Sequence, residues 1–200
     1  MTVFNEAYYR RFYEARSSRV QGRREVARLA TVAATIVEAT HGPIRTALEI
    51  GAGTGLWRDW FASHRPGVRY RSTDVSPYAC ERYAHELRDI SQWKARQRFD
   101  LVICQGVLPY LSSSAAGRAI RNLAAMTGAY LYLEAVTSHD LELVADASVT
   151  DDAMKRRSGV WYRKRLSPHF SQVGFGLWVR RGAAVRLWEL ECAPDGKPAR

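Results

Sequence analysis

The sequence is poor in cysteine and contains no long hydrophobic run. Cys80, Cys104 and Cys192 are odd in number, far apart and free of any C-x-x-C pairing, which argues against a disulfide framework and a cysteine-based zinc site. No window approaches the roughly 18 uncharged apolar residues that a membrane span needs. Residues 1–6 lack the basic start and apolar run of a secretion signal. We therefore expect a cytoplasmic protein without a membrane segment.

Lysine is also scarce, because Lys94, Lys155, Lys164 and Lys197 are the only lysines among 30 basic residues. The net charge of +10 would suit an anionic partner such as RNA, a nucleotide or an acidic metabolite. An arginine bias often reflects coding composition, so charge alone does not choose among these partners. Nucleic acid is the less favoured of them, but it is not excluded.

The apolar pattern alternates between strand and helix after a helical start. With 200 residues and 46% apolar side chains, the chain suits one compact domain. Residues 4–40 have helical spacing, typical of two helices that end at His41-Gly42-Pro43. Strands are predicted at residues 44–50, 68–74, 99–104 and 129–134, and helices at 56–63, 77–87 and 115–126. We therefore expect an N-terminal helical unit over residues 1–42 and an α/β unit over residues 43–200, with an insert at 137–162.

The end of the chain breaks this rhythm. A helix is predicted at residues 159–172, then strands at 175–179 and 184–191 joined by a turn at Arg181-Gly182. Strands joined so tightly must be antiparallel. The whole pattern predicts a doubly wound α/β fold, with a seven-stranded, mostly parallel sheet, a C-terminal antiparallel hairpin strand and helices on both faces.

A glycine loop follows the first predicted strand, where ligands of such sheets bind. Gly51, Gly53 and Gly55 form G-x-G-x-G, whereas a dinucleotide fingerprint needs its third glycine at position 56, which is Leu56. Glycines let the backbone take positive φ and approach a ligand closely. The helix start beyond them offers free N–H groups to a carboxylate. The spacing thus argues against the interpretation as a nicotinamide-dependent oxidoreductase and favours a different nucleoside ligand.

Asp74 closes the second predicted strand, where a carboxylate can accept hydrogen bonds from both ribose hydroxyls. An Asp in this position also caps a following helix, and Asp74-Val75-Ser76-Pro77 has the form of a helix start. Only together with the glycine loop does it indicate a nucleoside site.

Three segments resemble motifs I, II and IV of class I S-adenosylmethionine-dependent methyltransferases: residues 47–55, 72–77 and 99–108. The resemblance implies that the methionine end of S-adenosylmethionine lies on the glycine loop and the ribose at Asp74. It also implies adenine contacts from Asp89 and Ile90 and a turn at residues 105–107 that passes under the sulfonium. The implied cofactor-binding residues are Glu49, Gly51, Ala52, Gly53, Gly55, Asp74, Val75, Ser76, Asp89, Ile90, Gln105 and Val107.

Methyl transfer is a single in-line displacement, so alignment and exclusion of water dominate catalysis. A base is needed only where the acceptor must lose a proton. Tyr110, Glu134 and His139 are the candidate catalytic residues near the expected cofactor face, with Asp140 beside them and His169 a weaker candidate. Each could equally be a solvated loop residue or a satisfied polar group.

Acceptor binding is expected from segments outside the shared core. Tyr9 and Tyr13 lie in the N-terminal unit, where this family often keeps a lid, and Trp161 and Arg163 could hold an aromatic or carboxylated acceptor. Core packing explains such aromatic residues equally well. The acidic residues of the insert follow no calcium-loop spacing, so no metal is predicted.

The favoured function is therefore a methyltransferase acting on O or N of a small-molecule acceptor. The alternatives are an RNA or protein methyltransferase that uses the basic C-terminal surface, and a non-catalytic S-adenosylmethionine-binding protein. Neither the acceptor nor the oligomeric state follows from the sequence.

Overall fold

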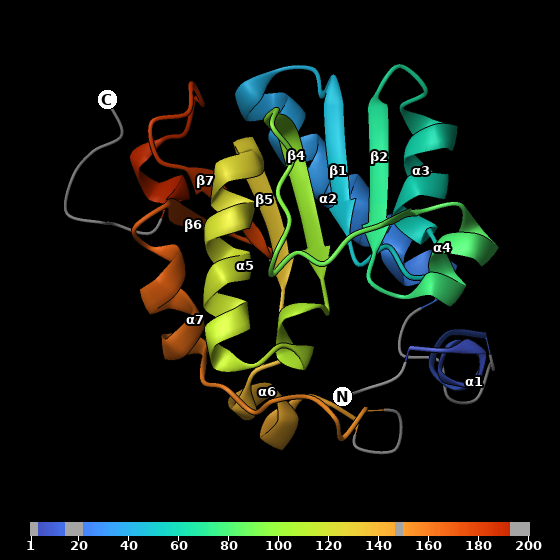
Figure 1. Ribbon diagram of the computed structural model, residues 1–200. Coiled ribbons are helices and arrows are strands. Elements are labelled where there is room, and N and C mark those ends of the chain that lie inside the picture. Colours follow the sequence, from blue (N-terminus) through green and yellow to red (C-terminus); the bar gives the residue numbers. More distant parts are fainter. Residues whose placement is uncertain (1–3, 15–21, 147–149, 193–200) are drawn as a thin grey trace.

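The computed structural model describes residues 4–14, 22–146 and 150–192, which form an α/β sheet with helices on both faces (Figure 1). The sheet has seven strands in the order β3-β2-β1-β4-β5-β7-β6. Strand β7 runs antiparallel to the other strands and lies between β5 and β6. The strands are β1 Thr46–Ile50, β2 Arg69–Asp74, β3 Glu86–Leu87, β4 Phe99–Gln105, β5 Thr127–Glu134, β6 Phe170–Gly174 and β7 Leu177–Arg180.

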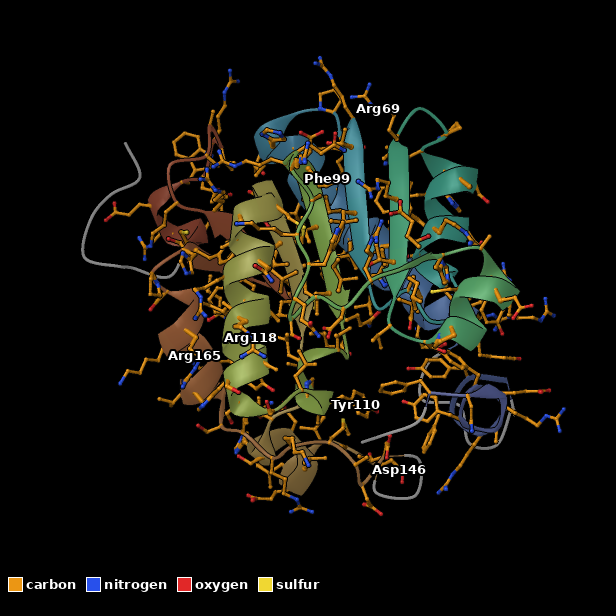
Figure 2. All side chains as sticks on the ribbon, in the orientation of Figure 1. Arg69, Phe99, Tyr110, Arg118, Asp146 and Arg165 are labelled. Carbon is orange, nitrogen blue, oxygen red and sulfur yellow. The ribbon has the colours of Figure 1, made fainter. Side chains whose placement is uncertain are left out.

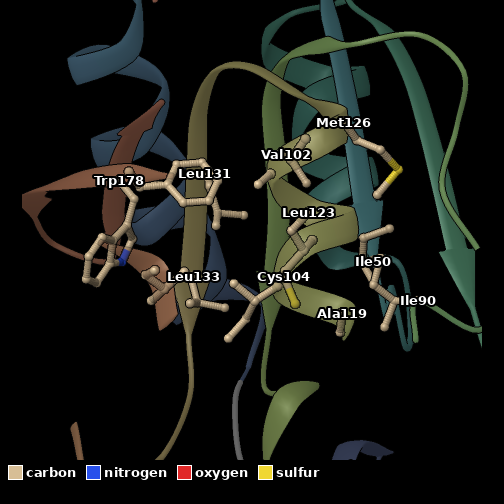
Figure 3. Close-up of a cluster of buried hydrophobic side chains, with 14 of the residues drawn as sticks. Ile50, Ile90, Val102, Cys104, Ala119, Leu123, Met126, Leu131, Leu133 and Trp178 are labelled. Atoms are coloured by element: carbon tan, nitrogen blue, oxygen red, sulfur yellow. The ribbon is translucent and has the colours of Figure 1, made fainter. Parts of the chain in front are cut away.

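Two apolar clusters sandwich the central strands. On one face α2 (Arg23–His41) and α3 (Leu56–His64) pack against the sheet. On the other face α5 (Ser113–Met126) and α7 (Gly159–Leu166) cover side chains of β4 and β5, as Figure 3 shows for Leu123, Val102 and Leu131. Strands β1, β4 and β5 are apolar on both sides because helices cover both sides.

The remaining elements are short and gather at the carboxyl ends of the parallel strands or at the chain ends (Figure 1). They are α1 Glu6–Tyr9, the π-helical turn η1 Arg10–Glu14, α4 Pro77–Tyr83, the 3-10 turn η2 Leu108–Tyr110, α6 Ser138–Leu143 and the 3-10 turn η3 Glu189–Glu191. No helix among the described residues is both long and apolar enough to cross a membrane.

The predicted fold class is confirmed, including the seven strands and the single antiparallel one. The expected hairpin was placed too late in the chain. The structure forms it from β6 and β7, which turn at Phe175 and Gly176, while residues 183–188 take no regular structure. The helix predicted at 159–172 accordingly ends at Leu166, and Phe170 begins a buried edge strand.

A second correction concerns residues 77–87, predicted as one helix. Helix α4 ends at Tyr83 because Ala84 adopts left-handed φ and ψ of 57° and 50°, and β3 follows beside Asp74. The sheet order reverses at β1, which pairs with β2 on one side and β4 on the other. A crevice is therefore expected beyond the carboxyl ends of β1 and β4.

Candidate functional site

The glycine loop joins β1 to α3 through three residues with positive φ. Gly51, Gly53 and Gly55 have φ of 69°, 56° and 77°, which glycine adopts without steric cost. A Cβ added to Gly51 would collide with Cγ2 of Val107. The N–H groups of Gly51 and Ala52 both donate to the carbonyl of Thr73, at 2.8 and 3.0 Å. The loop is therefore held by β2 and presents bare backbone towards its open side.

Glu49 lies at the base of this loop and is only 3% exposed. The Tyr70 hydroxyl donates to its Oε2 at 2.9 Å. Burial raises the pKa of Glu49 to about 8, although the hydrogen bond from Tyr70 opposes the shift. A buried acid that holds its proton so tightly can bind a cationic group and release that proton in exchange.

Asp74 ties the glycine loop to the start of α4. Its Oδ2 accepts from the N–H of Gly53 at 2.9 Å and its Oδ1 from the N–H of Ser76 at 2.8 Å. Ser76 caps α4 through the N–H of Ala79, as the sequence predicted for a helix start. Each carboxylate oxygen can accept a further hydrogen bond. The structural role of Asp74 and a ribose-binding role are therefore compatible.

A hydrogen-bonded row crosses the floor of the site between α3, β4 and β5. The Trp57 indole donates to Oε1 of Gln105 at 2.7 Å, and Gln105 Nε2 donates to Oε2 of Glu134 at 3.0 Å. The Tyr132 hydroxyl donates to the same carboxylate oxygen at 3.3 Å. Gln105 and Glu134 are register partners at the ends of their strands. The row fixes the orientation of Glu134.

A cavity of about 500 Å³ opens above this floor. Its wall includes the glycine loop, and five of its lining residues are acidic: Glu49, Glu134, Asp140, Asp146 and Asp151. No lysine, arginine or histidine is among the described residues that line it. Glu49 keeps its proton near neutral pH because its pKa is raised, but the other four acidic residues still make the cavity acidic in a chain with a net charge of +10.

The glycine loop, the crevice at the strand reversal and the sheet order agree with comparisons to known proteins. Residues 48–129 match a protein family described as "Methyltransferase domain". Residues 48–129 thus form a methyltransferase domain. S-adenosylhomocysteine, the product that S-adenosylmethionine leaves after methyl transfer, is bound in two of the similar structures described next. No curated protein sequence matches the chain.

Solved structures share the fold of this methyltransferase domain at low sequence identity. The plantazolicin methyltransferase BpumL, in complex with a pentazolic analog and S-adenosylhomocysteine, has a TM-score of 0.60 and 11% identity. The alignment covers 74% of this chain and 64% of that one. The N-methyltransferase NodS from Bradyrhizobium japonicum, with S-adenosylhomocysteine, has a TM-score of 0.51, 19% identity and coverage of 79% and 85%. DesVI from Streptomyces venezuelae has a TM-score of 0.57, 14% identity and coverage of 78% and 91%.

The residues present fit the cofactor of this methyltransferase class. Glu49 and the bare loop at Gly51 border the cavity, where they would hold the amino-acid end of S-adenosylmethionine. Asp74, Val75, Asp89 and Ile90 are not among the residues lining this cavity. Their predicted contacts with ribose and adenine remain predictions.

Asp89 and Ile90 follow β3, as the resemblance requires, but both have local partners. Asp89 accepts from the N–H of Ser91 and from Gln92 Nε2, both at 2.8 Å. Although burial raises it, these hydrogen bonds hold the pKa of Asp89 below its ordinary value. Ile90 is 3% exposed and belongs to the core cluster under α5.

The predicted catalytic residues do not all reach the cavity. Glu134 lines it, whereas His139 is exposed on α6 and does not. The hydroxyl of Tyr110 lies 3.0 Å from that of Tyr8, so α1 and η2 meet there. Tyr110 and Asp146 lie at one end of the molecule, opposite Arg69 and Phe99 (Figure 2).

The four predicted acceptor-binding residues separate into two places. Tyr13 lines the cavity, and Tyr9 is buried beside it, with its ring centroid 5.6 Å from that of Tyr78. Trp161 and Arg163 lie on α7 and do not line the cavity. Trp161 lies instead against the guanidinium carbons of Arg157 and Arg165, 4.8 and 3.7 Å from its ring centroid.

Sequence reasoning missed the roles of three aromatic residues: Tyr70 donates to the buried Glu49, Tyr132 donates to the partly buried Glu134, and Trp57 donates to Gln105. It weighed the acidic insert residues only as metal ligands. Among the described residues no group of three His, Cys, Asp or Glu side chains is arranged to hold a metal ion. The signal that could have identified the acidic insert residues as part of the site is that this segment is acidic although the chain as a whole is strongly basic.

Proposed function

We propose that this protein transfers the methyl group of S-adenosylmethionine to an amine nitrogen of a small-molecule acceptor bound in the cavity. The observation that carries the proposal is the acidic cavity wall beside the glycine loop. The chain spans 64% of the plantazolicin methyltransferase BpumL.

The charge of the cavity favours a cationic acceptor. A unit charge about 4 Å from a carboxylate gains on the order of 4 kcal/mol near a protein surface, before desolvation is counted. Several carboxylates around one cavity of about 500 Å³ therefore attract an ammonium group and repel carboxylates and phosphates. A neutral hydroxyl acceptor would gain little from such a wall. Nitrogen is accordingly favoured over oxygen as the methylated atom.

A further acid lies at this wall. Asp151 lines the cavity, and its Oδ1 accepts from the N–H of Ala153 at 2.9 Å. Its Oδ2 is enclosed by protein, so the contribution of Asp151 to acceptor binding is its acidic group at the wall and not a hydrogen bond to Oδ2.

Glu134 is the proposed proton acceptor. An ammonium acceptor must lose one proton before its nitrogen lone pair can attack, and an anchored carboxylate can take it. Gln105 and Tyr132 both donate to Oε2 of Glu134, which fixes the orientation of this carboxylate at the cavity wall. When bound, S-adenosylmethionine supplies a methyl group activated by its sulfonium. The protein orients the nitrogen in line with that methyl group and excludes water.

The alternatives receive less support. A polymer such as RNA would bring phosphates towards an acidic cavity. Two arginines of the basic C-terminal region have structural partners: Arg157 donates to the carbonyls of Leu108 and Leu111, and Arg165 stacks on Trp161. A non-catalytic binding protein would not need an oriented Glu134 in the cavity.

The test compares matched acceptors of similar size: primary and secondary amines, the corresponding alcohols and the corresponding carboxylic acids. We expect release of S-adenosylhomocysteine from S-adenosylmethionine only with amines. Glu134→Gln should lower kcat by about 10²–10⁴-fold, the usual contribution of a general base. The matched control is Glu142→Gln, because Glu142 is exposed on the neighbouring helix α6 and does not line the cavity.

Binding of S-adenosylhomocysteine, measured by calorimetry, should persist in both variants. A preference for alcohols or acids would contradict an amine acceptor. Cofactor binding without turnover of any acceptor would support the non-catalytic alternative.

A further inference from the structure

A second, smaller hollow of about 330 Å³ lies at the opposite end of the sheet from the acidic cavity. Its wall combines the start of β4, the C-terminal half of α5, the segment between α7 and β6, and the end of β7. The lining residues are Arg98, Arg121, Ala124, Ala125, Pro168, His169, Arg180 and Arg181. We call this hollow the arginine groove.

No acidic residue is among the described residues that line the arginine groove. The guanidinium groups of Arg98, Arg121 and Arg180 have neither a hydrogen bond nor an ion pair with any described residue. The nearest acid along the chain is Asp100, whose Oδ2 accepts instead from the N–H groups of Arg45 and Thr46. These three arginines therefore bring positive charge to the groove without an acidic partner among the described residues.

The walls of the arginine groove include the end of β7, which is paired with β6, and the long helix α5. Arg180 pairs in register with Phe170 across the β6–β7 hairpin. The next residue, Arg181, donates from its backbone N–H to the carbonyl of His169 at 2.9 Å and from Nε to the carbonyl of Ser167 at 2.7 Å. One wall is thus held by paired strands, and the facing arginine, Arg121, projects from the long helix α5. Like charges held close together on such a frame favour an anion between them.

We propose that the arginine groove binds the phosphate group of a small phosphorylated ligand. Guanidinium groups match the geometry of phosphate oxygens and can donate two parallel hydrogen bonds each. The residues converge on one hollow of about 330 Å³, which suits a single phosphate or diphosphate group. A nucleic-acid strand would call for a longer basic track with stacking residues, and no aromatic side chain lines the groove. The inference does not depend on the methyl-transfer function.

Calorimetric titration with inorganic phosphate, pyrophosphate and glycerol phosphate, at an ionic strength held constant with sodium chloride, tests the proposal. We expect saturable binding of at least one of them. Arg121→Gln and Arg180→Gln should each weaken it about tenfold or more, since each removes a charge-assisted hydrogen bond. Arg69→Gln should bind as the unmodified protein does, because Arg69 is exposed at the same end of the sheet but lies outside the groove (Figure 2).

Binding of S-adenosylhomocysteine serves as the folding control, and it should be equal in all four proteins. Absence of saturable binding by these phosphates, or equal affinity in Arg121→Gln, Arg180→Gln and Arg69→Gln, would overturn the proposal. So would an RNA oligonucleotide that binds where the small phosphates do not, because the groove would then serve a polymer.

Discussion

At the scale of single residues, Glu49 combines burial with an ionisable group, and we predict that it binds the cofactor in its charged form. Burial raises its pKa to about 8, whereas a glutamate in an unfolded chain has a pKa of about 4.3. Between these values the folded protein binds more protons than the unfolded chain. The free energy of unfolding therefore falls as the pH rises through this window and levels off above it.

We expect Glu49→Gln to remove this slope. At pH 8.5 and without cofactor, the variant should be more stable than the unmodified protein by about 1–3 kcal/mol, because each pKa unit corresponds to about 1.4 kcal/mol and the buried amide offsets part of the gain. Near pH 4 the two proteins should converge. Urea unfolding from pH 4.5 to 8.5 checks this expectation, and parallel stability curves for the two proteins would contradict it. The variant should also bind S-adenosylhomocysteine more weakly.

The sequence predicted the residues of the glycine loop well because their backbone requirement is local. Gly51, Gly53 and Gly55 adopt positive φ, which glycine as a residue type allows without steric cost. The partners of Glu49 and Glu134 could not be predicted in this way. Tyr70 reaches Glu49 across β1 and β2, and Gln105 reaches Glu134 across β4 and β5, so both contacts depend on strand register, which periodicity does not specify.

At the scale of elements, Arg157 fastens the segment before α7 to the turn η2. It is 6% exposed, and its guanidinium donates to the carbonyls of Leu108 and Leu111 and stacks on Trp161. Its own carbonyl accepts from the N–H of Ser138 at the start of α6. Arg157 thus ties the later part of the insert to η2 through its side chain and to the start of α6 through its backbone carbonyl.

Arg157→Leu should therefore lower the free energy of unfolding by about 2–4 kcal/mol, since two buried carbonyls lose their donors at roughly 1–3 kcal/mol each. The neighbouring Arg156→Leu is the matched control, because Arg156 is exposed and should change stability by less than about 0.5 kcal/mol. Urea unfolding of both variants makes the comparison. Equal stability of the two would show that the segment is held by other contacts.

The elements that the sequence misplaced share a physical cause. Helix α4 stops at Tyr83 because Ala84 turns left-handed, and the short, polar β3 that follows is specified by its neighbour Asp74 more than by its own pattern. Residues 184–191 carry a strand-like pattern, yet the antiparallel place beside β5 is taken by Leu177–Arg180. In both cases tertiary pairing decided the outcome over local propensity.

At the scale of the whole molecule, opposite charges gather at opposite ends of one sheet. The acidic cavity lies beyond the carboxyl ends of β4 and β5, and the arginine groove lies at the start of β4. The expected division into a helical unit at residues 1–42 and an α/β unit at 43–200 remains a prediction. The N-terminal segment does touch the site, because Tyr8 meets Tyr110 and Tyr13 lines the cavity.

This separation places acidic side chains around the cavity and basic side chains at the far end of the sheet. We expect a cationic acceptor to be attracted by the local field at the cavity before it makes contact, which raises its association rate. We expect kcat/KM for an amine acceptor to fall about tenfold or more between 10 mM and 500 mM salt while kcat changes little, because the Debye length shrinks from about 30 Å to a few ångströms. Steady-state kinetics over this range checks the expectation, and a neutral acceptor of the same shape should show no such dependence. A kcat/KM that stays constant with salt would mean that the acceptor is drawn in by contacts inside the cavity alone.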